Sequence, residues 1–110
     1  NASKVKSLDY KQQALQKEAD NGKLVLQNQL QNAFQQYNQN LSQYNYYKSI
    51  ALPNAEIIIS TAKVGFKSGD IGYIEYLQAL QTATDVQLNY LQSVNALNQS
   101  IVNINFLTNK

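Results

Sequence analysis

The chain has 110 residues, a formal net charge of +2, and no Cys, Met or Trp. This length suits one small domain or part of a larger protein. His and Arg are also missing, so disulfides, Cys or His metal sites and His-dependent nucleophile pairs are excluded. So small a charge provides no strong field for nucleic acid. We therefore expect no metal site, no cofactor and no nucleic-acid partner.

No segment has the features of a membrane span or a leader. The longest aliphatic run is Ile57–Ile59, far short of the ~20 apolar residues that a spanning helix needs. We see no signal peptide, which favours a mature or excised segment. We interpret Asn1 and Ala2 as a remnant of tag removal, and residues 3–110 as one structural unit.

Amides are unusually frequent, with 15 Gln and 14 Asn among 110 residues. Genomic bias explains part of this excess, but Ala55–Leu77 contains no amide at all. Charged residues are absent from Leu24–Tyr47 and from Val86–Asn109. A helix face in bulk water normally carries Lys and Glu. The neutral stretches therefore favour lateral packing against other helices or the lining of a wet channel.

The first half of the chain has the apolar spacing of one helix face. Apolar residues recur in steps of three and four, with Lys48 in the one seven-residue gap. This predicts a helix over about 3–64. Pro53 lacks an N–H and disfavours helix just before it, so we expect a kink near 51–53. A turn at Asp20–Lys23 is the alternative to a helix that continues through Gly22. The predicted seam consists of Leu30, Ala33, Tyr37, Leu41, Tyr44, Ala51, Ala55, Ile58, Ala62 and Phe66.

The strongest turn signal lies within residues 65–72, where three glycines accompany Ser68 and Asp70. We expect the tip of a hairpin there. The carboxylate of Asp70 is expected to cap the next helix, and Glu75 to support its first turn.

A second helix is expected over about 71–108. Its predicted seam consists of Ile74, Leu77, Leu80, Leu88, Leu91, Val94, Leu97, Ile101, Ile104 and Leu107. Folding the chain about Ser68 pairs position i with 136 − i, so the two uncharged stretches face each other. At 1.5 Å per residue the helices are ~90 and ~55 Å long. The fold class is therefore all-α, a long antiparallel helical hairpin or coiled coil, which buries too little surface to be stable without neighbours.

We find no enzyme signature. The acidic residues are scattered, and capping explains Asp70 and Glu75 better than acid–base catalysis does. The glycines of the tip lack phosphate-loop spacing and a preceding strand. The eight tyrosines lack the interleaved basic residues of a nucleic-acid surface, and we expect most of them to lie in seams.

The tip motif carries a family resemblance. Phe66–Ile71, FKSGDI, runs into Gly72–Ala79, GYIEYLQA. This pattern resembles the periplasmic tip of outer membrane efflux proteins of the TolC family. Leu26–Gln36 resembles the descending helix of their C-terminal repeat, and Leu88–Leu107 the ascending one. Ala51–Leu77 is similar to TolC-like segments associated with, or fused to, heavy-metal pumps of the CusA/CzcA type. The likeness covers nearly the whole chain.

The resemblance implies a trimeric α-helical barrel that forms a tunnel across the periplasm, below an outer-membrane β-barrel. This chain would be one hairpin of that tunnel, a passive conduit in a tripartite RND-type efflux system for heavy-metal cations. Its partners would be copies of itself, a periplasmic adaptor and an inner-membrane RND pump. It would touch a membrane only through parts that lie outside this chain.

By the same resemblance, the tip turn docks on the adaptor or pump. The matching docking residues are Phe66, Gly69, Asp70 and Ile71. Glu75 matches an acidic position that narrows the closed tunnel, whereas the next such position is Gln78, which leaves a double acidic ring in doubt. Phe66 stands where Tyr is more usual.

Two conformational expectations follow for the tip. Gly69 should adopt a positive φ or be approached closely by a partner backbone. Phe66 and Ile71 should be semi-exposed beside it. The alternative is that both fold inward and only staple the turn.

Two other functions remain open. The α-hairpin of a periplasmic adaptor is also a long antiparallel pair, but it usually carries an Arg-Leu-Ser-like tip, and this chain has no Arg. A generic coiled-coil scaffold without a transport role is the second, and the uncharged faces disfavour it.

Overall fold

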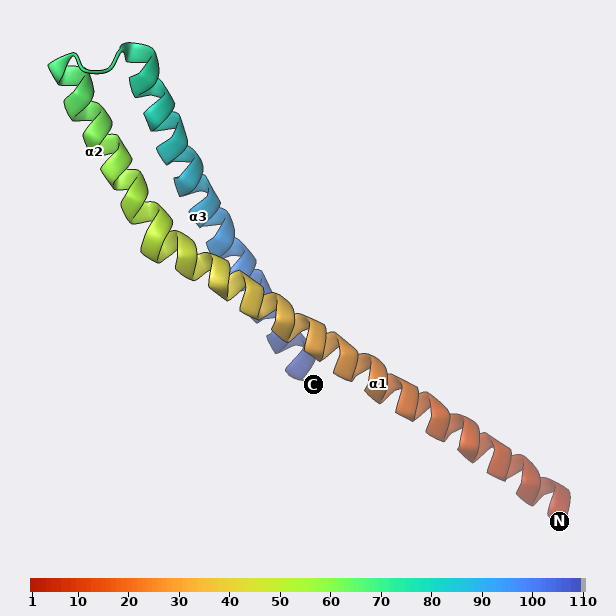
Figure 1. Cartoon of the computed structure of the whole chain (residues 1–110). Coiled ribbons are helices and arrows are strands. Elements are labelled where there is room, and N and C mark those ends of the chain that lie inside the picture. Colours follow the sequence, from red (N-terminus) through yellow and green to blue (C-terminus); the bar gives the residue numbers. More distant parts are fainter. Residues whose placement is uncertain (110) are drawn as a thin grey trace.

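The computed structural model describes residues 1–109 and consists of two antiparallel helical arms joined by a short turn (Figure 1). The first arm contains α1 (Ala2–Tyr46), the π-helix η1 (Tyr47–Ala51) and α2 (Leu52–Ser68), and the second is α3 (Tyr73–Thr108). The molecule measures 98 × 21 × 15 Å. Residues 1–109 contain no strand, so the expected all-α hairpin is confirmed.

The first helix is continuous through Gly22, as expected. The helix α1 spans 45 residues, and it begins with Asn1 as its cap. The Asn1 side chain accepts a hydrogen bond from the Ser3 amide at 3.2 Å. Asn1 and Ala2, interpreted as a tag remnant, thus form the helix start. Figure 1 shows that α1 extends well beyond the end of α3.

Two contacts confirm the expected register of the arms. The Asn40 side chain donates a hydrogen bond to the Ala96 carbonyl at 3.1 Å, and 40 + 96 = 136. Near the tip, a Cβ built on Gly65 would lie 3.3 Å from Cγ1 of Ile71, and 65 + 71 = 136. The uncharged parts of the two arms therefore lie side by side.

Small residues form the contact between the arms, which we call the seam. No large side chain in residues 1–109 is fully buried. Small side chains let the two backbones approach closely, but they remove little apolar surface from water. The hairpin is therefore held together by modest burial. The buried residues are Ala33, Asn40, Ala51, Ala55 and Ala62 in the first arm, and Ala83, Ser93 and Ser100 in α3.

In the half nearest the tip, the expected seam of α3 is wrong at four of its five positions, and only Leu80 is half-buried as expected. Ile74 and Leu91 are 71% and 60% exposed, and Leu77 and Leu88 also face solvent. The residues immediately before two of them, Tyr76 and Tyr90, are half-buried instead. A close approach of the backbones requires a small residue such as the fully buried Ala83. Farther from the tip, Val94, Leu97, Ile104 and Leu107 are half-buried as expected. Ile101 is the exception, since it is 40% exposed.

The seam of the first arm contains one extra residue. Buried or half-buried positions recur every seven residues at Ala33, Asn40 and Tyr47, and again at Ala55 and Ala62. The step from 47 to 55 is eight residues. A π-helical turn accommodates one residue more than an α-helical turn, and η1 lies at this step. The π-helix thus keeps both α1 and α2 facing α3.

The helix irregularity therefore lies before the expected kink. It occupies Tyr47–Ala51 rather than 51–53, and Tyr47, not Lys48, continues the seam. The Leu52 amide donates to the Tyr47 carbonyl across the wide turn. Pro53 then falls in the first turn of α2, where its missing N–H costs little.

Candidate partner-docking surfaces

The tip turn is a Schellman motif centred on Gly69. Gly69 has φ +82° and ψ 5°, the left-handed conformation that was expected there. Its amide donates to the Phe66 carbonyl at 3.3 Å, and the Asp70 amide donates to the Gly65 carbonyl at 2.8 Å. These bonds end α2 at Ser68, four residues later than expected. Gly65 therefore belongs to the helix, because the αL residue, not the first glycine, ends it.

Asp70 does not cap α3, contrary to expectation. The cap residue is Gly72, which makes no side-chain capping bond. Its carbonyl accepts from the Tyr76 amide at 3.0 Å and closes the first turn. The backbone at 70 and 71 is held by the Schellman motif, since both amides donate to Gly65. Glu75 lies in the first turn of α3, as expected.

Phe66 and Ile71 are both semi-exposed and packed against the turn. The Phe66 ring stacks on Tyr76 at 4.9 Å between centroids with 14° between the planes, and also contacts Tyr73 at 6.1 Å. Phe66 is still 41% exposed. Ile71 is half-buried against Gly65. The two residues thus staple the turn and also present apolar surface at the tip.

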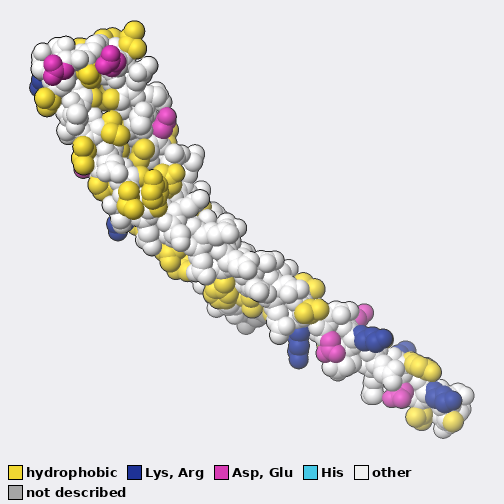
Figure 2. Space-filling view, in the orientation of Figure 1, with side chains coloured by type: hydrophobic (Ala, Val, Ile, Leu, Met, Phe, Trp, Pro, Cys, Tyr) yellow, Lys and Arg dark blue, Asp and Glu magenta, His cyan; other side chains and the backbone are white. Residues whose placement is uncertain are grey.

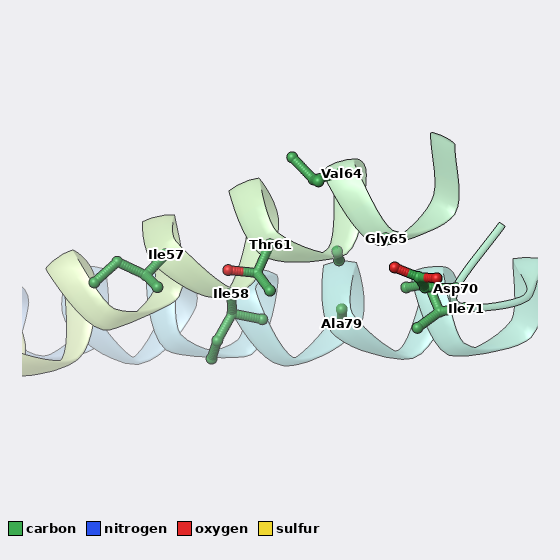
Figure 3. Close-up of a pocket in the computed structure, with 9 residues that line it drawn as sticks. Ile57, Ile58, Thr61, Val64, Gly65, Asp70, Ile71 and Ala79 are labelled. Atoms are coloured by element: carbon green, nitrogen blue, oxygen red, sulfur yellow. The ribbon is translucent and has the colours of Figure 1, made fainter. Parts of the chain in front are cut away.

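A groove of about 540 Å³ runs along the first arm just below the tip (Figure 3). Small residues line it where the two arms meet: Ala62, Gly65 and Ala79. Asp70 is the only charged residue in the lining. The remaining lining residues are Ile57, Ile58, Thr61, Val64 and Ile71. The groove is an apolar surface whose one charge lies at its tip end.

Each arm also carries an exposed apolar stripe outside the seam. The first-arm stripe consists of Ile50 in η1 and of Ile57 and Val64 in α2, spaced by seven residues and 52%, 61% and 68% exposed. The α3 stripe consists of Ile74, Leu77, Leu88, Leu91 and Val102, which are also exposed. The heptad spacing of the first-arm stripe is visible in the sequence, but the expected seams include only one apolar face of each arm.

A polar cluster lies in the seam of the uncharged region. Asn40 donates to the Ala96 carbonyl and to the Ser100 hydroxyl, and it accepts from Gln36 at 3.4 Å. Ser100 donates to the Ala96 carbonyl at 3.1 Å. Buried polar groups of this kind cost stability unless they are paired, and here they are. No signal in the sequence separates Asn40 from the other thirteen asparagines.

The two constriction candidates, Glu75 and Gln78, are both exposed and lie three residues apart on α3, on neighbouring positions of one helix side. Their role in narrowing a tunnel stays a prediction. Within residues 1–109, no three His, Cys, Asp or Glu side chains lie together as metal ligands would. No helix in the described part combines the length and hydropathy required to cross a bilayer.

The comparisons with known proteins give no identification. No family model, no curated protein and no solved structure matches this chain. The function is therefore argued from the geometry of the hairpin and from the tip motif.

Proposed function

We propose that this chain is a periplasmic hairpin of a TolC-like outer membrane efflux protein. It forms part of the wall of a passive, oligomeric conduit, trimeric in the intact protein, in an RND-type export system for heavy-metal cations. It performs no catalysis. Its tip docks on the periplasmic adaptor or on the pump. The observation that carries the proposal is the tip turn, where the FKSGDI motif forms a left-handed Gly69 beside an exposed Phe66.

The tip presents more apolar surface than a free hairpin end needs. Val64 and Tyr73 are more than 60% exposed, and Phe66 and Ile74 are exposed beside them. Contiguous exposed apolar surface in a soluble region marks a site that a partner covers. Gly69 adds a backbone without a side chain, and no heavy atom lies within 4 Å of where its Cβ would be. A partner backbone therefore has room to approach the turn.

The uncharged region is suited to a passive wall. Figure 2 shows charged side chains at the tip and along the start of α1, and none over the middle of the molecule. Amide side chains offer hydrogen bonds to water but no fixed charge. A hydrated cation therefore passes such a wall without the strong, localised binding that carboxylates or imidazoles provide. Energy for transport comes from the pump.

The test uses the intact protein that carries this hairpin, in cells whose resistance to a toxic metal cation depends on it. Gly69→Arg places a long charged side chain in the approach to the turn. We expect resistance to fall to the level of cells that lack the protein, while the amount in the envelope stays unchanged.

Two control variants separate docking from folding. Gly69→Asn keeps a residue that tolerates positive φ and adds little bulk, so most resistance should remain. Gly22→Arg adds the same side chain far from the tip, where no atom lies within 4 Å of the new Cβ. Normal resistance with Gly69→Arg would contradict the proposal. So would equal losses with Gly69→Arg and Gly69→Asn, because strain in the turn rather than docking would then explain both.

A further inference from the structure

Residues 2–25 of α1, which we call the overhang, contain the one Asn-Gly pair of the chain, Asn21–Gly22. We propose that Asn21 is a site of spontaneous modification, at which the side-chain amide is converted to an aspartyl or isoaspartyl group while the overhang is uncovered. The inference does not depend on the export role, since it concerns the end of the hairpin opposite the tip (Figure 1).

The reaction needs only these two residues and water. The backbone nitrogen of Gly22 attacks the side-chain carbonyl carbon of Asn21, and the bond from that carbon to the amide nitrogen breaks. The amide nitrogen takes up the proton that the Gly22 nitrogen loses and leaves as ammonia. Water then opens the resulting succinimide ring and restores the N–H of Gly22. Opening at one ring carbonyl gives an ordinary aspartyl residue, and opening at the other gives an isoaspartyl residue, whose main chain runs through the side chain.

Gly22 makes Asn21 the most reactive of the fourteen asparagines. A side chain on the following residue hinders the approach of its nitrogen, and each of the other thirteen asparagines is followed by a residue that has a side chain. No heavy atom from elsewhere in the protein lies within 4 Å of where a Cβ of Gly22 would be, and Asn21 is exposed. The attack therefore meets no steric hindrance from other parts of the molecule.

The helix itself restrains the reaction. Residue 21 lies within α1, and the succinimide ring closes only after the backbone at this residue has left the helical conformation. The rate therefore depends on how often α1 opens locally at Asn21. Gly22 favours opening, since a glycine inside a helix costs about 1 kcal/mol relative to alanine. Between residues 4 and 30 the described side chains form one hydrogen bond, from Gln16 to Asp20 at 3.2 Å, so little opposes it.

The second arm does not support α1 at Asn21. By the register of the arms, the end of α3 at Thr108 is level with residue 28, so the overhang lies beyond α3. All of its residues are exposed, and Figure 1 shows it as a single extended helix. An isolated helix of this length is only marginally stable in water. The overhang therefore opens more readily than the parts of α1 and α3 that pack against each other.

The modification disrupts the overhang in two ways. An isoaspartyl residue adds one carbon atom to the main chain, which breaks the regular hydrogen bonding of the helix. Either product also adds a negative charge three residues after Glu18, and like charges at this spacing destabilise a helix. A partner that packs on the overhang keeps the helix closed and protects Asn21. The modification thus marks chains whose overhang has stayed uncovered.

Mass spectrometry of the purified chain, incubated at mildly alkaline pH, tests the proposal. Trypsin releases the peptide Glu18–Lys23, in which Asn21 is the only side-chain amide. We expect this peptide to be converted before any other asparagine reacts, and a protein isoaspartate methyltransferase to methylate the product. The helical circular dichroism signal should fall in step with the conversion. The variant Gly22→Ala should slow the loss of Asn21, because the new side chain hinders the attack and stabilises the helix.

The matched control is Gln99→Gly, which creates the same dipeptide at Asn98 in the paired part of α3. Asn98 and Gln99 are exposed, but the adjacent Ser100 is buried in the seam. In this one molecule we expect Asn21 to be lost roughly tenfold faster than Asn98, because the paired arm opens less often. Equal rates would overturn the proposal, because the dipeptide rather than the uncovered helix would then decide the rate. Loss of Asn98 with Asn21 intact would overturn it too. The purified chain contains no export partner, so a failure here is separate from a failure of the resistance assay.

Discussion

The tip half and the uncharged half of the hairpin bring the same two arms together by different chemistry. In the tip half, from η1 to α2 and along α3 to Asp85, the buried residues are alanines. In the uncharged half, three of the four buried residues are polar: Asn40, Ser93 and Ser100. Close approach of the backbones thus requires small side chains, while their polarity differs with position.

This difference separates two tasks. Alanine contacts are non-directional and define no unique register by themselves. The Asn40 cluster is directional, since its amide bonds only to groups at one height on α3, and a single buried Asn is a known device for fixing register. The tip half leaves its large apolar residues exposed for neighbours, and the uncharged half aligns the arms.

Deleting one residue from α2 should have the largest effect on this arrangement. Deletion of Ser60 rotates Ala62 and the tip by about 100° out of the seam, and we expect a loss of stability above about 4 kcal/mol. Deletion of Ser49 removes the eighth residue at η1 and leaves Ala55 and Ala62 facing α3. Thermal unfolding followed by circular dichroism should show a much smaller change for it. Equal losses would contradict the role assigned to the π-helix.

Overpacking the alanine contact should have the next largest effect. Ala83 is fully buried, so Ala83→Leu should destabilise the hairpin by about 3 kcal/mol. The neighbouring exposed position gives the control, and Thr84→Leu should change stability by less than about 0.5 kcal/mol. Urea denaturation of both variants measures the difference. Tolerance of Ala83→Leu would show that the arms are not in close contact in the tip half.

Removing the polar cluster should cost less. Asn40→Ala loses two donated hydrogen bonds and should destabilise by about 2 kcal/mol, whereas Gln39→Ala, on the exposed side, should have little effect. The same denaturation experiment compares them. If both variants match the unchanged chain, Asn40 does not set the register, and the distinction between the two halves is lost.

The turn itself should give the smallest effect. Gly69→Ala forces an L-residue into the left-handed region and should cost about 1 kcal/mol. Gly72 has φ −85°, so Gly72→Ala should be nearly neutral. Thermal unfolding of the pair measures this strain. A neutral Gly69→Ala would mean that the tip does not hold the left-handed turn in solution.

The apolar spacing in the sequence predicted both helices. The glycine cluster at residues 65–72 predicted the tip, and with it the register of the arms and a positive φ as one of two alternatives for Gly69. These features depend on local chemistry, because a glycine-rich break between two periodic segments allows few solutions. Apolar spacing also predicted the first-arm seam correctly at Ala51, Ala55 and Ala62, but two other expected seam residues, Ile58 and Phe66, are exposed.

Three features depended on packing and were not predicted. On α3, two apolar series differ by a single residue, and only the small Ala83 shows which one faces inward. The extra residue at η1 is visible only once burial is known on both sides of it. Asp70 is a residue type that often caps helices. Here the amides of residues 70 and 71 donate to the Gly65 carbonyl, so the chain is still part of the turn at Asp70, and α3 begins only after Gly72.

The most direct test of the account is to ask what touches the tip in the cell. A photo-reactive amino acid replaces Lys67, an exposed residue beside the turn, in the intact protein, and the adducts are identified by mass spectrometry. The same residue at Lys11, far from the tip, serves as the control. The account predicts an adduct with a periplasmic adaptor or an inner-membrane pump from position 67 and none from position 11. Adducts only with other copies of this protein, or the same partners from both positions, would contradict a docking tip.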